Sequence, residues 1–128
     1  AMAMLNTARR QLGAVFARRD LWLTPTTARV AEPWGRYNLG RDDVPYEAYA
    51  EQILAPVAQH TLPHNIMGTP AISLPLFLHS SGLPIGVQLA AAPAQELVLL
   101  QLAGELEQAL PWAGRTPPLH VAAVAGAR

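Results

Sequence analysis

The sequence contains no cysteine and no lysine, and each absence excludes a class of chemistry. Without cysteine, the 128-residue chain can hold neither a disulfide nor a thiolate-ligated zinc ion. All nine basic residues are arginine, so no mechanism in which this chain itself supplies a lysine base is open to it. Serine is also scarce, because only Ser73, Ser80 and Ser81 are present.

Charged residues are also few, because they make up 14% of the chain, and the formal net charge is zero. The arginines are scattered and form no basic face, which argues against a nucleic-acid partner. No apolar run is long enough for a membrane-spanning helix, and the first residues do not resemble a signal peptide. We therefore expect a cytoplasmic protein with no membrane segment. With 51% hydrophobic residues and so few charges, it must either bury nearly all of its apolar surface or cover some of it with a partner.

The first half of the chain alternates between helical and extended patterns. Apolar residues at helical spacing predict a first helix over 5–19. A brief buried strand is expected at 21–23, stopping at Thr24-Pro25, because proline cannot donate to a strand ladder. The Gly- and Pro-containing stretch 31–44 is typical of a surface loop.

A second helix is predicted over 46–62. Pro56 should kink or split it and Pro63 should end it, since a proline inside a helix removes one hydrogen bond and clashes with the preceding turn. Two aspartates before Pro45 favour a side-chain cap followed by a first-turn proline. These aspartates are Asp42 and Asp43.

The strongest strand signal lies between residues 71 and 92. Two apolar runs flank Ser80, Ser81 and Gly82, which predicts an antiparallel hairpin with both faces buried. Pro75 and Pro84 should then stand where no ladder N–H is needed. A helix over 95–110, ended by Pro111, should pack on this hairpin, and the tail 119–128 should fray. These elements predict an α/β fold: a fragment of a mixed β-sheet with flanking helices.

Three patterns of polar residues or glycines are typical of functional sites, but in each case the sequence favours a structural explanation. His60 and His64 are four residues apart, a spacing that suits zinc, but Pro63 lies between them and no third ligand is near. Ser80 and Ser81 follow His79, but neighbours on a strand point to opposite faces, so a turn is favoured over a catalytic pair. The glycines, including Gly86, fit turn and close-packing positions, not a phosphate-binding loop.

Four segments, in order and at the right spacing, resemble the amidase-signature family. The family pattern D-x-x-L-x-P-T is matched at 20–26, and N-x-x-G-x-P-A-x-x-x-P at 65–75. The pattern G-L-P-x-G-x-Q follows at 82–88, and E-x-x-L-L-x-x-A-x-x-L-E at 96–107. Residues 1–128 are thereby identified as similar to the C-terminal part of an amidase-signature domain.

The resemblance implies an amide hydrolase that needs neither a metal nor an organic cofactor. In the family, a nucleophilic Ser, a bridging Ser and a Lys base carry the reaction, and all precede the segments matched here. No catalytic residue is therefore assigned to this chain, which should be inactive alone. Asn65, Gly68 and Pro70 could form part of the substrate-pocket wall, although a structural role in a helix-to-strand connection is favoured.

Two readings of the whole chain follow from the resemblance. In the first, the chain is the C-terminal scaffold of an enzyme that hydrolyses carboxylic amide C–N bonds. Its partner is then the missing N-terminal part of the same enzyme, and the isolated chain is expected to form a homo-oligomer. The alternative is a free-standing, non-catalytic module that binds a partner chain and derives from such an enzyme. A native mass several times 13.7 kDa in a source extract would favour the first reading.

Overall fold

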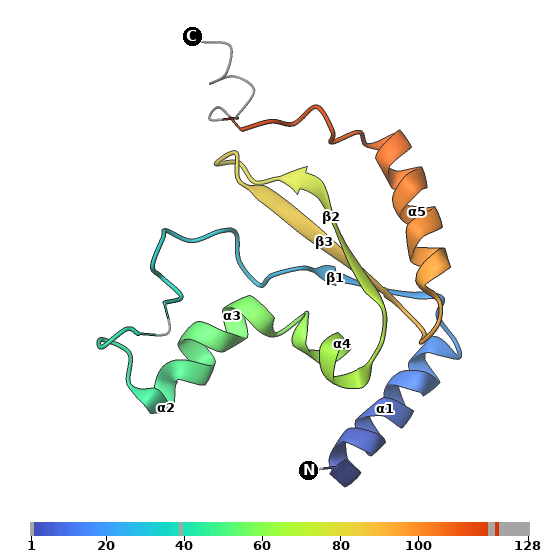
Figure 1. Ribbon diagram of the computed structural model, residues 1–128, viewed down its shortest axis with the longest axis horizontal. Coiled ribbons are helices and arrows are strands. Elements are labelled where there is room, and N and C mark those ends of the chain that lie inside the picture. Colours follow the sequence, from blue (N-terminus) through green and yellow to red (C-terminus); the bar gives the residue numbers. More distant parts are fainter. Residues whose placement is uncertain (1, 39, 118–119, 121–128) are drawn as a thin grey trace.

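The computed structural model describes residues 2–38, 40–117 and 120, and it contains one small sheet with helices on both faces (Figure 1). Apart from His120, the expected fraying tail lies outside these residues. Among the described residues, no helix combines the length and the apolar character that a bilayer crossing requires. The elements, in chain order, are α1 (Met2–Phe16), β1 (Leu21–Pro25), α2 (Tyr46–Tyr49), the π-helix η1 (Ala50–Leu54), α3 (Ala55–Ala58), α4 (Leu62–Met67), β2 (Ala71–Leu78), β3 (Pro84–Ala91) and α5 (Glu96–Ala109).

The predicted hairpin is confirmed, because β2 and β3 pair antiparallel and turn at Ser80–Gly82. The His79 N–H donates to the Leu83 carbonyl over 2.8 Å, and Gly82 takes a φ of 82°, which an L side chain rarely adopts. β1 adds to the other side of β3, also antiparallel, giving the strand order β1-β3-β2. The described part of the chain is thus an α/β fragment whose sheet has two edge strands, β1 and β2.

The prolines of the sheet avoid the central ladder, as expected. Pro25 is the last residue of edge strand β1, and Pro84 is the first residue of β3. Pro75 lies in edge strand β2, within an irregularity of register between Leu74 and Phe77. Proline has no N–H to donate, so strand ends, bulges and edges are where it is tolerated.

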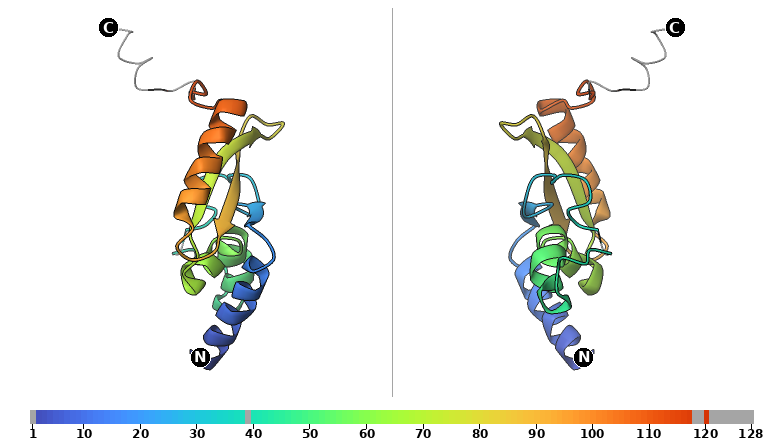
Figure 2. Two further views of the ribbon diagram at one scale, coloured as in Figure 1. Left: turned by 90° about the vertical axis from the view of Figure 1, so that its right-hand side faces the viewer. Right: turned by 90° about the vertical axis from the view of Figure 1, so that its left-hand side faces the viewer.

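The hydrophobic core lies between the hairpin and α5, which covers one face of the sheet (Figure 2). Leu99 of α5 is the most buried residue of the helix, and Leu102, Ala103 and Leu106 pack beside it. The predicted helix on the hairpin is therefore confirmed. The strand residues of this core are Leu74, Leu76, Val87, Leu89 and Ala91.

Two expectations about burial are wrong. β1 is not a buried strand, because Leu23 is 65% exposed and Trp22 is 40% exposed. Burial on both faces holds for much of β3 but not for β2, where Phe77 and Leu78 are exposed. For Leu23 the physical reason is that α5 makes its sheet contacts mainly with β3 and β2. The apolar sequence of β1 is that of a buried strand, while its surroundings here are open.

The helical stretch from residue 46 differs from expectation at its end. Pro56 does split it: the backbone switches from π-helix to α3, and Pro56 occupies the first turn of α3. Pro63 does not end the helix, because the run already stops at Ala58 and Pro63 lies in the first turn of α4. A proline is tolerated in a first turn since the N–H it lacks has no partner there.

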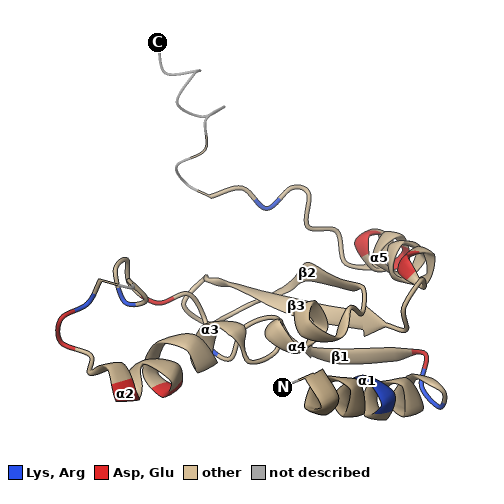
Figure 3. Cartoon of the chain, turned by 60° about the horizontal axis from the view of Figure 1, so that its bottom comes forward, with Lys and Arg blue, Asp and Glu red and all other residues tan. Residues whose placement is uncertain are grey.

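The predicted aspartate cap is also wrong. Pro45 itself is the N-cap of α2, and no side chain caps that helix. Asp43 instead pairs with Arg41, and this hydrogen bond lowers the pKa of the Asp43 carboxyl and raises that of the Arg41 guanidinium. Charged side chains lie on the helices, loops and connections, whereas all three strands are without charge (Figure 3).

Candidate functional site

The three residues proposed as pocket wall lie together in the connection from α4 to β2. Asn65 is exposed on α4, and Gly68 ends that helix with a φ of 74° while its N–H donates to the His64 carbonyl over 2.8 Å. The Pro70 carbonyl accepts the Ala91 N–H over 3.1 Å, which begins the pairing of the hairpin. The contacts of Gly68 and Pro70 support the helix-to-strand role for these two residues; a role of all three as pocket wall stays a prediction.

His64, beside this connection, is buried and bonded within the chain. Its Nδ1 lies 2.8 Å from the Thr69 hydroxyl, and its ring stands edge-on to Trp22 at a centroid distance of 6.2 Å. Burial removes water from the imidazole and lowers its pKa. His60 is held differently, because its backbone carbonyl accepts a hydrogen bond from Gln88. Within the described residues, no three His, Asp or Glu side chains are placed to share a metal ion.

Gln88 on β3 connects the sheet to the helices on the face opposite α5. This side chain is 4% exposed, and its Nε2 donates to the Thr24 hydroxyl over 3.2 Å and to the His60 carbonyl over 2.8 Å. The two contacts tie β3 to its neighbour β1 and to the turn between α3 and α4. A cavity of about 70 Å³ lies next to them and is lined by Trp22, Thr24, Gln59, His60, Pro63, His64 and Met67.

On the same face, two hydroxyl groups meet across the central strand. Thr26 Oγ1 and Ser73 Oγ lie 2.6 Å apart, although Thr26 follows β1 and Ser73 belongs to β2. They meet above Gly86, where a Cβ atom would stand only 2.6 Å from the Thr26 oxygen. Gly86 therefore packs closely against Thr26 on one side and Ser73 on the other, in agreement with its predicted close-packing role.

This polar set was not identified from the sequence as a group. Its members are Thr24, Thr26, Ser73 and Gln88. The available signal was the placement of single polar residues in or beside otherwise apolar strands, at positions that turn to one face of the sheet. The set can donate and accept hydrogen bonds, but within the part of the chain that the structure describes no basic side chain is hydrogen-bonded to the Ser73 hydroxyl to activate it as a nucleophile.

The hairpin turn does contain a His–Ser hydrogen bond, which the sequence argument on neighbouring residues did not anticipate. His79 Nδ1 lies 2.7 Å from the Ser81 hydroxyl, because the chain reverses between them. The same nitrogen also accepts the Ser81 N–H over 3.2 Å. Both residues are exposed, and their contacts close a turn. A turn is the structure that the sequence favours for this segment.

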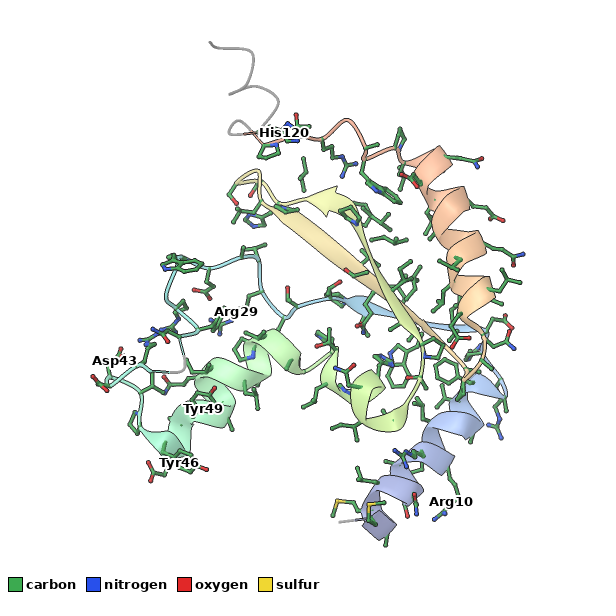
Figure 4. The ribbon with its side chains drawn as sticks, viewed as in Figure 1. Arg10, Arg29, Asp43, Tyr46, Tyr49 and His120 are labelled. Carbon is green, nitrogen blue, oxygen red and sulfur yellow. The ribbon has the colours of Figure 1, made fainter. Side chains whose placement is uncertain are left out.

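A further cavity, of about 480 Å³, is formed by the loop between β1 and α2. One continuous segment, 32–38, lines it, and Trp34 on that segment is fully exposed. Glu32 lies between two arginines, 3.4 Å from Arg29 and 3.8 Å from Arg36, so its charge is balanced. Figure 4 places Arg29 on the side of the molecule away from α5.

Comparison with known proteins relates these elements to one family. The family model described as Amidase matches residues 1–100. The chain is 42% identical over 103 residues to the 6-aminohexanoate-cyclic-dimer hydrolase of Paenarthrobacter ureafaciens, covering 78% of this chain and 21% of that protein. It is also 42% identical over 103 residues to the 6-aminohexanoate-cyclic-dimer hydrolase of Pseudomonas sp. (strain NK87), with the same coverage of 78% and 21%.

The solved structures agree with the sequence match. A structure of 6-aminohexanoate cyclic dimer hydrolase superposes with a TM-score of 0.72 at 39% identity, over 89% of this chain and 23% of that one. The chain therefore spans about a fifth of the length of the relatives it matches. Because the family model covers most of its residues, the chain belongs to the amidase family.

Proposed function

We propose that this chain is the C-terminal scaffold of an enzyme that hydrolyses carboxylic amide C–N bonds, and that it is not catalytic alone. The observation that carries the proposal is the combination of an amidase-family match over residues 1–100 with the complete lack of lysine. The family resemblance implies a Lys base and paired serines. A polypeptide that matches the family yet has no lysine must receive its base from elsewhere.

The serines of this chain support the same reading. Ser73 is hydrogen-bonded to Thr26, and Ser81 is hydrogen-bonded to His79 in an exposed turn. These hydroxyls have the surroundings of structural groups.

The open surface of the fold fits a part that is covered by more protein. Large apolar side chains stand exposed on the sheet and on α5, for example Leu23 at 65% and Leu97 at 66%. We expect the isolated chain to cover such side chains by associating with copies of itself.

The test is turnover of a panel of aryl amides and esters by the purified chain. We expect no hydrolysis above the buffer rate. Turnover that Ser73→Ala or Ser81→Ala abolishes would contradict the proposal, since it would give this chain its own nucleophile. Ser80→Ala serves as the matched control, because Ser80 lies in the same turn as Ser81.

A further inference from the structure

The outward edge of β2 carries backbone groups that β3 does not bond. The Ala91 N–H donates to the Pro70 carbonyl over 3.1 Å, and hydrogen-bonded pairs alternate along an antiparallel ladder. This alternation turns the backbone groups of Ala71, Ser73 and Pro75 away from β3. Outward groups of this kind form a template on which another strand can pair.

The end of this edge next to the hairpin turn is also open. The His79 N–H donates to the Leu83 carbonyl, and by the same alternation Leu78 is an outward residue. The side chains of Leu78 and Phe77 are both 55% exposed. No residue of β2 is charged, so nothing within the strand would repel another strand. Its own sequence leaves this edge suited to pairing, except at Pro75, which has no N–H.

Arg115 reaches this edge from outside the sheet. Its Nη1 donates to the Pro75 carbonyl over 2.8 Å and lies 3.5 Å from the Leu76 carbonyl. Both carbonyls belong to the register irregularity between Leu74 and Phe77. The guanidinium occupies an acceptor that an incoming strand would need, and it places a positive charge beside an uncharged strand. Charged side chains at an edge are one means by which natural sheets avoid further pairing.

Arg115 is positioned by the segment that follows α5. The helix ends at Ala109, and the chain then runs back toward the hairpin (Figure 1). Trp112 packs against the hydrophobic core, and its carbonyl accepts the Arg115 N–H over 2.9 Å. The indole therefore holds one end of a short turn, and the guanidinium lies at the other end. The fold thus sets the place of Arg115 at the edge, although the residue itself is exposed.

We propose that Arg115 covers the outward edge of β2 and prevents this edge from pairing with the β2 strand of a second copy. A second copy is the occupant because two identical edges can pair antiparallel about a two-fold axis, and an uncharged strand does not repel its own copy. The exposed side chains of Phe77 and Leu78 would add apolar contacts from both copies. The inference goes beyond the hydrolase role and does not depend on it, since it concerns a contact within the chain.

Edge pairing differs from association through exposed apolar side chains in its effect on the backbone. Association through side chains leaves the outward N–H groups of β2 free to exchange with water, whereas strand pairing bonds them to the other copy. Amide hydrogen exchange, resolved to single residues, therefore reports edge pairing directly. The amides to follow are those of Ala71, Ser73 and Leu78.

The test compares the full 128-residue chain with its Arg115→Ala variant. Association is followed by light scattering after size exclusion across a dilution series, and hydrogen exchange is measured on the same samples. We expect Arg115→Ala to associate at about tenfold lower concentration, because a charge-assisted contact no longer covers the edge, and to protect the outward amides of β2. Arg10→Ala is the matched control, since it removes an exposed arginine from α1, and it should leave both measurements unchanged.

Further variants show whether the edge itself is responsible. Leu78→Lys returns a positive charge to the edge, so in the Arg115→Ala background it should restore wild-type exchange. Leu97→Lys makes the same change at an exposed leucine of α5, and in that background it should leave the outward amides of β2 protected. Arg115→Lys keeps the charge and should exchange like the wild type. Far-ultraviolet circular dichroism checks that each variant is folded.

The outcomes separate a covering role of Arg115 from a purely structural one. Protection of the outward β2 amides in Arg115→Ala, reversed by Leu78→Lys but not by Leu97→Lys, would support the inference. An Arg115→Ala chain that unfolds at lower urea concentration, yet exchanges these amides as the wild type does, would overturn it, because Arg115 would then only hold the segment after α5 in place. Protection that Leu97→Lys also reverses would overturn it as well, since the association would then run through side chains.

Discussion

The hydroxyl oxygens of Thr26 and Ser73 lie 2.6 Å apart on either side of β3, and only a glycine at position 86 allows this. A Cβ at that position would stand 2.6 Å from one oxygen and 2.9 Å from the other. Atoms at such distances overlap, so one or both edge strands would have to move. The contact links three strands, and it makes Gly86 a sensitive position for stability.

We expect Gly86→Ala to lower the free energy of unfolding by about 1–3 kcal/mol, the usual cost of forcing extra volume into a packed site. Urea unfolding followed by circular dichroism would measure it. Gly104→Ala is the control: a Cβ there meets nothing within 4 Å, and α5 should gain about 0.5–1 kcal/mol from the better helix former. Equal midpoints for Gly86→Ala and wild type would show that the hydroxyls separate at no cost.

Gln88→Leu should also destabilise the fold, for a different reason. The substitution keeps much of the side-chain volume but leaves the His60 carbonyl and the Thr24 hydroxyl without the donor they share. Leaving buried polar groups unpaired costs about 1–3 kcal/mol, again measurable by urea unfolding. Gln101→Leu, on the exposed side of α5, should change the unfolding free energy by less. Similar losses in both variants would argue against the connection through Gln88.

The His64 imidazole predicts a pH dependence of stability with a defined sign. Burial lowers its pKa below the ordinary value of 6.5, so the unfolded chain binds a proton more readily than the folded chain. Stability is therefore fully present above pH 6.5 and falls as the pH drops through 6.5 toward the folded pKa. Urea unfolding from slightly alkaline to mildly acidic pH would show this decrease. His64→Gln should flatten the curve, and an unchanged slope in that variant would assign the effect to other groups.

The local patterns of the sequence predict the hairpin and α5, because both depend on apolar spacing and on a turn glycine that lie within one stretch of chain. Those patterns cannot show the contact between Thr26 and Ser73, which are 47 residues apart and meet only through the order β1-β3-β2. The patterns also give a wrong prediction for β1. An apolar strand is predicted to be buried, but its burial depends on which other parts of the protein lie next to it in space.

Among the candidate site residues, the same distinction holds. Gly68 could be recognised as a turn position, and its φ of 74° agrees with the helix-to-strand connection. The polar face built from Thr24, Thr26, Ser73 and Gln88 required the register of three strands. A register is set by pairing across the sheet, and no single segment of the sequence specifies it.

The isolated chain should self-associate, and this final prediction follows from its uncovered apolar side chains. Besides Leu23 and Leu97, Leu100 is 62% exposed and Phe77 is 55% exposed. Re-covering about 1,000 Å² of apolar surface would gain on the order of 25 kcal/mol, against an association cost of about 4–15 kcal/mol. Light scattering after size exclusion, across a hundredfold dilution, should show a dimer or a larger assembly. Leu97→Gln with Leu100→Gln on the outer side of α5 should weaken it. A folded monomer at every concentration that binds no hydrophobic dye would mean that the chain covers its own core.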